Sequence, residues 1–143
     1  MSAAAPPRAA VPRPRGLLDT SVVIALEELP LAALPEEAAI SALTLAELTA
    51  GPHATTDPAE RARRQDRLQR TEAAFDPLPF DLAAARAYGR VLAAVVGQGR
   101  AARGRRAVDL MVAATALAGG LPLYTRDPDD LRGLEDLVEI VTV

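Results

Sequence analysis

Short apolar segments alternate with longer segments of helical pattern from Gly16 to the end of the chain. The expected strands cover residues 16–18, 38–41, 77–79, 121–125 and 137–141, and the expected helices cover 21–29, 44–50, 58–75, 82–95 and 109–118. Such alternation is typical of a parallel sheet with helices on both faces. Because Pro77 and Pro79 lack a backbone N–H, the strand between them is expected at a sheet edge. The sequence therefore predicts an α/β protein, an α/β/α sandwich around a central, mainly parallel sheet of short strands.

The length and composition of the chain fit one domain. Its 143 residues, of which 50% are hydrophobic and 24% charged, suit a single globular core. Residues 1–15 include four prolines and three arginines, and they contain no apolar run long enough for a signal peptide or a membrane span. We therefore predict a flexible tail over residues 1–15 and one domain over residues 16–143.

Cysteine and histidine usage removes most kinds of reactive site. The chain has no cysteine, which excludes disulfides, thiolate zinc sites, iron–sulfur clusters and cysteine nucleophiles, and which is consistent with a cytoplasmic location. His53 is the only histidine, so multi-histidine metal sites are excluded. A Ser-His-Asp triad would depend on this one imidazole in the turn-like segment 51–54. Carboxylates, hydroxyls and arginines remain as the groups that can do chemistry.

Four acidic residues lie at strand ends or in helices of the predicted fold, namely Asp19, Glu47, Asp109 and Asp127. Each has an ordinary structural explanation. Asp19 and Asp109 could be helix N-caps, Glu47 an exposed helical residue, and Asp127 part of an Asp-Pro turn. The carboxyl ends of parallel strands are also where such folds concentrate their functional sites. The four residues therefore have two interpretations, local structure or a shared site.

The sequence neighbours of three of these acids favour the shared site. Asp19 directly follows an apolar strand, Glu47 lies in the apolar stretch 41–48, and Asp109 precedes the apolar residues 110–114. Carboxylates are almost never buried unless they are paired. Three carboxylates that enter a core from three elements indicate a common site for a hard cation. Oxygen ligands without histidine or cysteine suit Mg²⁺ or Mn²⁺ and suit zinc poorly.

Positive charge is concentrated in one stretch of an acidic chain. The net charge is −3, and all 16 basic residues are arginine. Eleven of them lie between Arg61 and Arg106 against four acidic residues, so this stretch carries +7 and the remainder −10. The predicted helix around 61–70 and a basic loop over 100–106 have two interpretations, a solvated surface or a contact with nucleic-acid phosphates.

Four stretches of the sequence occur in the order and at the spacing of a known family. They are 17–24 (LLDTSVVI), 40–48 (ISALTLAEL), 109–116 (DLMVAATA) and 123–131 (LYTRDPDDL). On these motifs the chain resembles the PIN-domain ribonucleases, specifically the VapC toxins of bacterial type II toxin–antitoxin systems. The resemblance covers the chain from about residue 17 to its end and implies a PIN-like sandwich.

The resemblance also implies an activity. Asp19, Glu47 and Asp109 would be the principal acids of a metal site and Asp127 the fourth. The implied reaction is endonucleolytic cleavage of RNA with Mg²⁺, or Mn²⁺, which would arrest translation and growth in the cytoplasm. The implied partners are the RNA substrate and a VapB-type antitoxin that inhibits the toxin, and we expect a homodimer within the toxin–antitoxin complex.

Some details stay open at this point. Thr20 and Thr125 are both candidates for a supporting hydroxyl. Leu131 occupies a position that is usually aromatic in the family, so either Asp127 or Asp130 is the fourth acid. Two other functions also stay open, a non-catalytic PIN-like module that binds protein and a metal-dependent nuclease or phosphodiesterase with another substrate. Cleavage assays on RNA, DNA and a simple phosphodiester would distinguish them.

Overall fold

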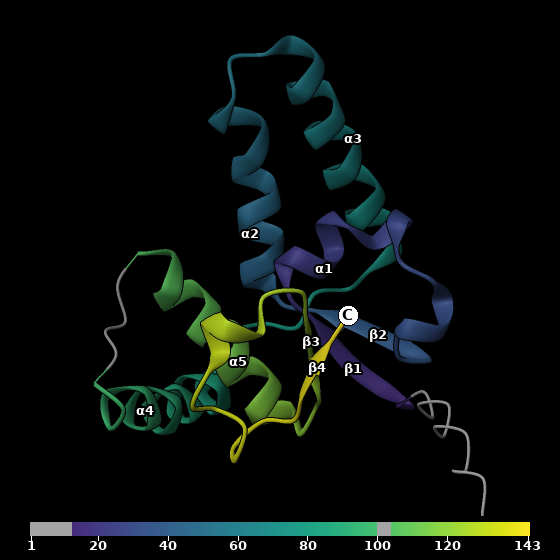
Figure 1. Cartoon of the computed structure of the whole chain (residues 1–143). Helices are drawn as coiled ribbons and strands as arrows, with labels where there is room; N and C mark the ends of the chain where they lie inside the picture. The colour runs from purple at the N-terminus through teal and green to yellow at the C-terminus, as the bar shows by residue number, and fades with distance from the viewer. Residues whose placement is uncertain (1–12, 100–103) are drawn as a thin grey trace, which may run out of the picture.

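The computed structural model describes residues 13–99 and 104–143, and it places a parallel sheet between two layers of helices (Figure 1). The sheet has the strand order β2-β1-β3-β4 and every neighbouring pair is parallel. Its strands are β1 (Arg15–Leu18), β2 (Glu37–Ile40), β3 (Leu123–Thr125) and β4 (Ile140–Thr142). The helices are α1 (Thr20–Ile24), α2 (Ala42–Ala50), α3 (Pro58–Ala74), α4 (Leu82–Val96) and α5 (Arg105–Gly119). The predicted α/β/α fold is confirmed.

Alternate residues of the strands face two separate cores, because successive side chains of a strand point to opposite faces of the sheet. Leu17 and Leu123 are fully buried and pack with residues of α4 and α5 in one core. Leu18 and Tyr124 lie on the other face and pack with residues of α1, α2 and α3. Complete burial of one leucine stabilises a fold by about 1.5–3 kcal/mol. The central strands are therefore fixed from both sides.

Helices α2 and α3 lie side by side and extend well beyond the sheet (Figure 1). We call residues 42–74 the α2–α3 hairpin. Helix α3 begins after Asp57, whose side chain accepts a hydrogen bond from the backbone N of Ala59 at 3.2 Å, and Pro58 occupies the first helical position. Only Leu68 and Thr71 of α3 are buried. Most of this arginine-rich helix therefore contacts solvent.

The strand predicted at 77–79 is wrong. It is reduced to a single parallel bridge between Leu78 and Ser41, because the prolines on both sides of Leu78 have no N–H to donate to a ladder. The bridge extends the β2 side of the sheet, so the expected edge position is correct. Within the described ranges the sheet therefore has four strands where the sequence predicted five.

Two helix boundaries differ from the prediction by more than two residues. Helix α1 ends at Ile24, and a separate 3₁₀ turn covers Leu26–Glu28. Helix α5 begins at Arg105 rather than at Asp109, because Gly104 turns the chain with a φ of +57°, a conformation that glycine adopts readily. Arg105 and Arg106 of the expected basic loop are thus helical, and residues 100–103 of it lie outside the described residues. None of the helices in the described ranges has the length and apolar character needed to cross a membrane.

The described chain begins close to the sheet. Arg13 forms an ion pair with Glu139, just before β4, and Arg15 is the first residue of β1. The flexible tail predicted over residues 1–15 lies mostly outside the described residues, which start at residue 13.

Candidate active site

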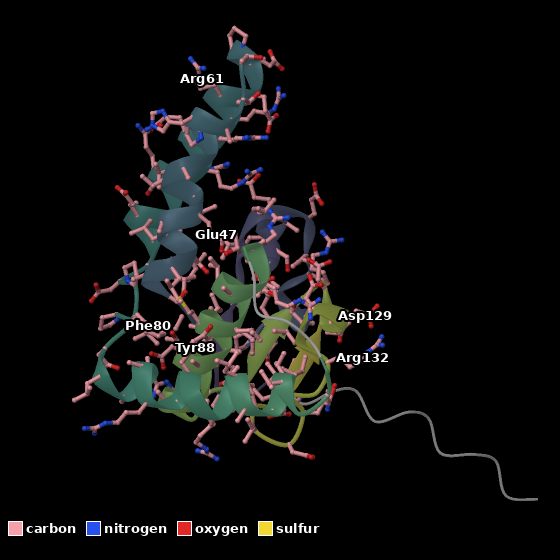
Figure 2. The ribbon with its side chains drawn as sticks, turned by 90° about the vertical axis from the view of Figure 1, so that its left-hand side faces the viewer. Glu47, Arg61, Phe80, Tyr88, Asp129 and Arg132 are labelled. Atoms are coloured by element: carbon pink, nitrogen blue, oxygen red, sulfur yellow. The ribbon has the colours of Figure 1, made fainter. Side chains whose placement is uncertain are left out.

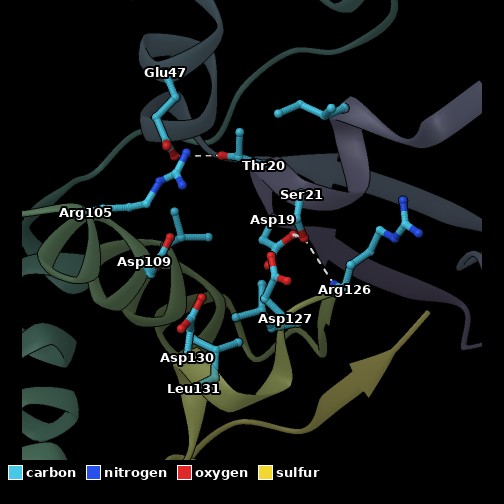
Figure 3. Close-up of a pocket in the computed structure, with 13 residues that line it drawn as sticks. Asp19, Thr20, Ser21, Glu47, Arg105, Asp109, Arg126, Asp127, Asp130 and Leu131 are labelled. Atoms are coloured by element: carbon cyan, nitrogen blue, oxygen red, sulfur yellow. Dashed lines mark hydrogen bonds between the residues drawn. The ribbon is translucent and has the colours of Figure 1, made fainter. Parts of the chain in front are cut away.

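A cleft of about 430 Å³ opens at the carboxyl ends of β1 and β3 (Figure 3). Parallel strands bring their carboxyl ends to the same edge of a sheet, and α2 and α5 add side chains from beside it. Five carboxylates line the cleft, those of Asp19, Glu47, Asp109, Asp127 and Asp130. The structure thus brings together all four acids singled out in the sequence, and it adds Asp130.

Asp19 is both the N-cap of α1 and a residue of the cleft. Its Oδ1 accepts hydrogen bonds from Ser21 Oγ at 2.6 Å and from the backbone N of Val22 at 3.1 Å. Burial raises the pKa of Asp19 above its ordinary value, and hydrogen bonds from Ser21, Thr125 and the Val22 amide oppose the rise. Asp19 is therefore a helix N-cap and a cleft residue at the same time, so its two interpretations do not exclude each other.

Ser21 connects the ends of two strands, which the sequence analysis did not anticipate. Its Oγ donates to Asp19 and accepts a hydrogen bond from the backbone N of Arg126 at 3.1 Å (Figure 3). Thr125 Oγ1 accepts from the backbone N of Asp127 at 3.0 Å. Hydroxyls from both strand ends therefore fix the backbone that carries Asp19 and Asp127.

Glu47 is held by hydroxyl groups. Thr20 Oγ1 lies 2.7 Å from Glu47 Oε1 and 3.1 Å from Thr44 Oγ1. Thr44 is completely buried, and its backbone N donates to Ser41 Oγ at 3.1 Å. Glu47 thus projects from α2 into the cleft with its orientation set by α1, and Thr20 is a supporting hydroxyl of this kind.

Asp109 lies in the second turn of α5, so its interpretation as an N-cap is wrong. Burial and, after it, the negative charges of Glu47, Asp130 and Asp19 raise the pKa of Asp109 to about 6, while the charge of Arg105 opposes the rise. No described residue donates a hydrogen bond to this carboxylate. The negative charge of Asp109 therefore lies among other negative charges and is compensated only weakly by the protein.

Both candidates for the fourth acid, Asp127 and Asp130, line the cleft (Figure 3). The charge of Asp127 acts on Asp19, whereas the charge of Asp130 acts on Asp109. The two acids after β3 therefore face opposite ends of the cleft, one toward β1 and the other toward α5.

Two arginines also line the cleft. Arg105 points into it from the start of α5, and Arg126 lies beside Ser21 after β3 (Figure 3). From the sequence, Arg105 is expected in a basic loop, and Arg126 is not among the candidate site residues. The position of Arg126 in the sequence could have indicated its place at the cleft. It lies between Thr125 and Asp127, which were both candidate site residues.

The donor set suits a hard cation, because it consists of carboxylate and hydroxyl oxygens without nitrogen or sulfur. In residues 13–99 and 104–143, no three acidic side chains converge closely enough to ligate one ion directly. Mg²⁺ usually keeps several waters and takes only one or two carboxylates from the protein. The residues present therefore fit Mg²⁺, or Mn²⁺, held partly through water.

Comparison with known proteins gives consistent matches in sequence. The family model of the PIN domain matches residues 16–136. The chain is 38% identical over 133 residues to Ribonuclease VapC5 of Mycobacterium tuberculosis, across 90% of this chain and 95% of that protein. It is 35% identical over 133 residues to Ribonuclease VapC4 of the same organism, across 90% of this chain and 97% of that protein.

The same similarity holds in three dimensions. A crystal structure of VapBC-5 from Mycobacterium tuberculosis, described as a member of the VapBC family of toxin–antitoxin systems, matches with a TM-score of 0.79 and 39% identity. The match covers 91% of this chain and 99% of that chain. A crystal structure of FitAcB from Neisseria gonorrhoeae matches with a TM-score of 0.67 and 26% identity, over 88% of this chain and 96% of that one.

Proposed function

Because this chain belongs to the PIN-domain family and, within it, to the VapC ribonuclease toxins, we propose that it cleaves RNA with the help of Mg²⁺ at the cleft and thereby arrests translation and growth. One observation carries the proposal. Five carboxylates from four segments of the chain line one cleft, and burial of Asp109, together with the like charges around it, raises its pKa to about 6. Bringing these charges together costs stability, and a bound cation offsets that cost.

Hydrolysis of a phosphodiester needs an activated water and neutralisation of charge at the scissile phosphate. A divalent cation held by the cleft would supply both without a histidine base. Asp19 and Asp109 are the proposed direct ligands. Glu47 is a ligand or orients the attacking water, and Asp127 is an outer ligand on the β1 side.

Other residues of the chain position these acids and the substrate. Ser21 holds the Asp19 carboxylate, and Thr20 holds the Glu47 carboxylate, so both are presented in one orientation. Arg105 and Arg126 border the same cleft and are placed to contact phosphates beside the cut. Contacts to phosphates position a nucleic acid but carry no sequence information. The cleft therefore accounts for cleavage, and sequence choice depends on contacts elsewhere.

The proposal includes a protein partner. VapBC-5 is described as part of a toxin–antitoxin system, so we propose a VapB-type antitoxin as the inhibitor of this chain and a homodimer of the chain within that complex. A cleft with five carboxylates attracts a basic side chain. We expect an arginine or lysine of the antitoxin to occupy the place of the cation. Mn²⁺ should then bind the complex more weakly than it binds the free toxin, and equal affinity would contradict this mode of inhibition.

Cleavage assays test the proposed reaction. RNA, single-stranded DNA and a simple phosphodiester are incubated with the protein in Mg²⁺ and in EDTA. The expected result is cleavage of RNA in Mg²⁺ alone. Asp109→Asn, which removes one charge at nearly constant size, should abolish cleavage and also abolish growth arrest on expression.

The matched control is Asp76→Asn, the same chemical change at an exposed residue outside the cleft. This control should cleave RNA like the parent. Binding of RNA or of a partner protein without any metal-dependent cleavage would instead indicate a non-catalytic module. Faster cleavage of DNA or of the simple diester would indicate a different substrate.

A further inference from the structure

A second groove, of about 440 Å³, is continuous with the acidic cleft. The two hollows share Thr20, Ile24, Glu47 and Arg105 as lining residues. From there the second groove runs along the α2–α3 hairpin, past Leu48 and on toward the 3₁₀ turn Gly51–Ala54. We call it the hairpin groove. Figure 2 shows Glu47 at its inner end and Arg61 near the far tip of the hairpin.

Most arginines of α3 already have partners within the chain. Arg61 donates to the backbone O of Pro52 and Thr55, Arg63 and Arg64 form ion pairs with Glu60, and Arg70 forms ion pairs with Glu27 and Asp66. Some of these contacts lie within α3, and the others join α3 to the connection that follows α2 and to the 3₁₀ turn after α1. The broad surface of arginines expected over 61–70 is therefore mostly structural.

Arg67 differs from its neighbours on α3. It lines the hairpin groove, and within the described part of the chain its guanidinium makes no hydrogen bond or ion pair, while its backbone O accepts a hydrogen bond from Thr71 Oγ1 at 2.8 Å. Glu60 also lines the groove, and its negative charge is balanced by Arg63 and Arg64. Their hydrogen bonds lower the pKa of Glu60. Of the three arginines that line the groove, Arg64 is paired with Glu60, Arg105 at the mouth acts on the charge of Asp109, and the guanidinium of Arg67 has no ion-pair partner among the described residues.

Leu48, Ala50 and Ala54 are among the residues that line the hairpin groove, and no aromatic residue of the described chain lines it. A surface without aromatic side chains offers no platform for stacking bases. The unpaired guanidinium of Arg67, with Arg105 at the mouth and apolar side chains along the same groove, suits a sugar–phosphate chain. The continuity with the acidic cleft favours the substrate over a separate acidic protein, because a strand held at the acids must leave the cleft through one of its openings.

We propose that one arm of the RNA substrate leaves the acidic cleft through the hairpin groove, where Arg67 and Arg105 hold its phosphates. Arg67 is a positioning residue in this proposal, since it lies outside the acidic cleft. The proposal rests on the proposed ribonuclease function. It predicts that substrate contacts extend further on one side of the cut than on the other.

Substitution of Arg67 tests the groove directly. Arg67→Gln should raise KM for RNA by about tenfold, the range for loss of a charge-assisted hydrogen bond, and change kcat by less than roughly twofold. Arg67→Lys should restore most of the affinity, because a phosphate contact needs the positive charge first. The matched control is Arg86→Gln on α4, an exposed arginine outside both hollows, and it should leave KM unchanged.

RNA binding gives a readout that does not depend on cleavage. In an Asp109→Asn background, filter binding across a range of KCl concentrations yields the slope of log affinity against log salt. Loss of one phosphate contact should reduce this slope by about 0.7 for a single strand. Arg67→Gln should show this reduction, and Arg86→Gln should keep the slope of the parent.

Shortened substrates test the path of the strand. After the cut is mapped, RNAs are trimmed step by step on either side of it. The parent enzyme should lose affinity when one particular arm is trimmed, and Arg67→Gln should be insensitive to that same trimming, because the two changes remove one contact. Equal sensitivity of both proteins to trimming of both arms would overturn the proposal.

The outcomes separate this proposal from the function on which it rests. A parent protein that cleaves no RNA contradicts the proposed function. If the parent cleaves RNA and the KM and salt slope of Arg67→Gln equal those of Arg86→Gln, the proposed function stands and the groove assignment is overturned. Normal cleavage by Arg67→Gln combined with weakened inhibition by a co-expressed antitoxin also overturns it, because the groove is then a protein interface.

Discussion

The two ends of the acidic cleft are built differently. At the β1 end, Asp19 receives hydrogen bonds from Ser21 and from the backbone of Val22, and it caps a helix. At the α5 end, Asp109 receives no hydrogen bond from a described residue and faces the charges of Glu47 and Asp130. Burial raises the pKa of both aspartates; for Asp19 hydrogen bonds oppose the rise, whereas for Asp109 neighbouring negative charges add to it and the pKa is about 6.

This difference shows that one end of the site is fixed by the fold and the other is left uncompensated. The hydrogen bonds of Asp19 stabilise its charged form in the absence of any ligand. Asp109 gains its main compensation only when a cation or a basic group arrives. Structural and functional demands are therefore divided between two residues of the same type.

The largest expected effect concerns metal affinity at the uncompensated end. Asp109→Asn should weaken Mn²⁺ binding by more than about 100-fold, measured by calorimetry on the intact chain. Loss of an outer-shell partner costs up to about 100-fold, and loss of a direct ligand should cost more. Asp76→Asn should bind Mn²⁺ like the parent. Unchanged affinity in Asp109→Asn would remove this residue from the site and erase the contrast between the two ends.

A smaller effect is expected at the fixed end when its hydroxyl is removed. Ser21→Ala keeps the hydrogen bond from the Val22 amide to Asp19. It removes the hydrogen bond that Ser21 Oγ donates to Asp19 and the one that it accepts from the backbone N of Arg126. Loss of such an orienting partner typically costs about 10–100-fold. We expect Mn²⁺ affinity to fall by about tenfold while kcat at saturating metal recovers. Ser21→Thr should rescue the affinity, which a purely structural defect would not allow.

The pH dependence of stability should differ between parent and Asp109→Asn in metal-free buffer. The pKa of Asp109 is about 6 in the fold and near 3.9 in an unfolded chain. Between these values the folded state binds the extra proton, so its stability falls as the pH rises from 4 to 6. Asp109→Asn lacks this loss and should be more stable at pH 8 by about 1.5 kcal/mol, a figure reduced for solvent screening at a half-buried group.

Thermal unfolding in EDTA at pH 4 and pH 8 measures this difference. The two proteins should have similar stability at pH 4. Addition of Mg²⁺ at pH 8 should reverse the order and favour the parent, because only the parent has the full ligand set. A variant less stable than the parent at both pH values would show that the Asp109 charge is stabilised in the metal-free fold.

The smallest expected effect is the contribution of Asp19 as a cap. Asp19→Ala should destabilise the fold by about 1 kcal/mol, since it removes the acceptor for the Val22 amide, whereas Asp19→Asn keeps a capping oxygen and should cost less. Both variants should lose cleavage. Chemical denaturation at neutral pH measures the difference, and equal stability of the two variants would show that the cap contributes little here.

The sequence predicted the parts of the site that depend on local pattern. Asp19 follows an apolar strand and Glu47 lies in an apolar helix, and a parallel sheet then places both at one edge. The bond from Arg126 to Ser21 joins residues 105 positions apart, so no local pattern could reveal it. The early start of α5 was missed for another reason, because Gly104 has no side chain with which to signal a cap.

The arginines of α3 show the same limit. Ion pairs of Glu60 with Arg63 and Arg64 follow from helical spacing and are readable in the sequence. The bond from Arg61 to Pro52 depends on how the chain turns between α2 and α3. Only the folded hairpin therefore separates the occupied arginines from Arg67.

The position of β3 between β1 and β4 has a consequence for the folding of the chain during its synthesis on the ribosome. Synthesis adds about 5–20 residues per second, so Arg126 leaves the ribosome on the order of ten seconds after its hydrogen-bond partner Ser21. Until then β1 lacks a neighbour on one side, and the acids after β3 do not yet exist. The cleft consequently cannot be complete in a growing chain until the segment that carries Arg126, Asp127 and Asp130 has been synthesised.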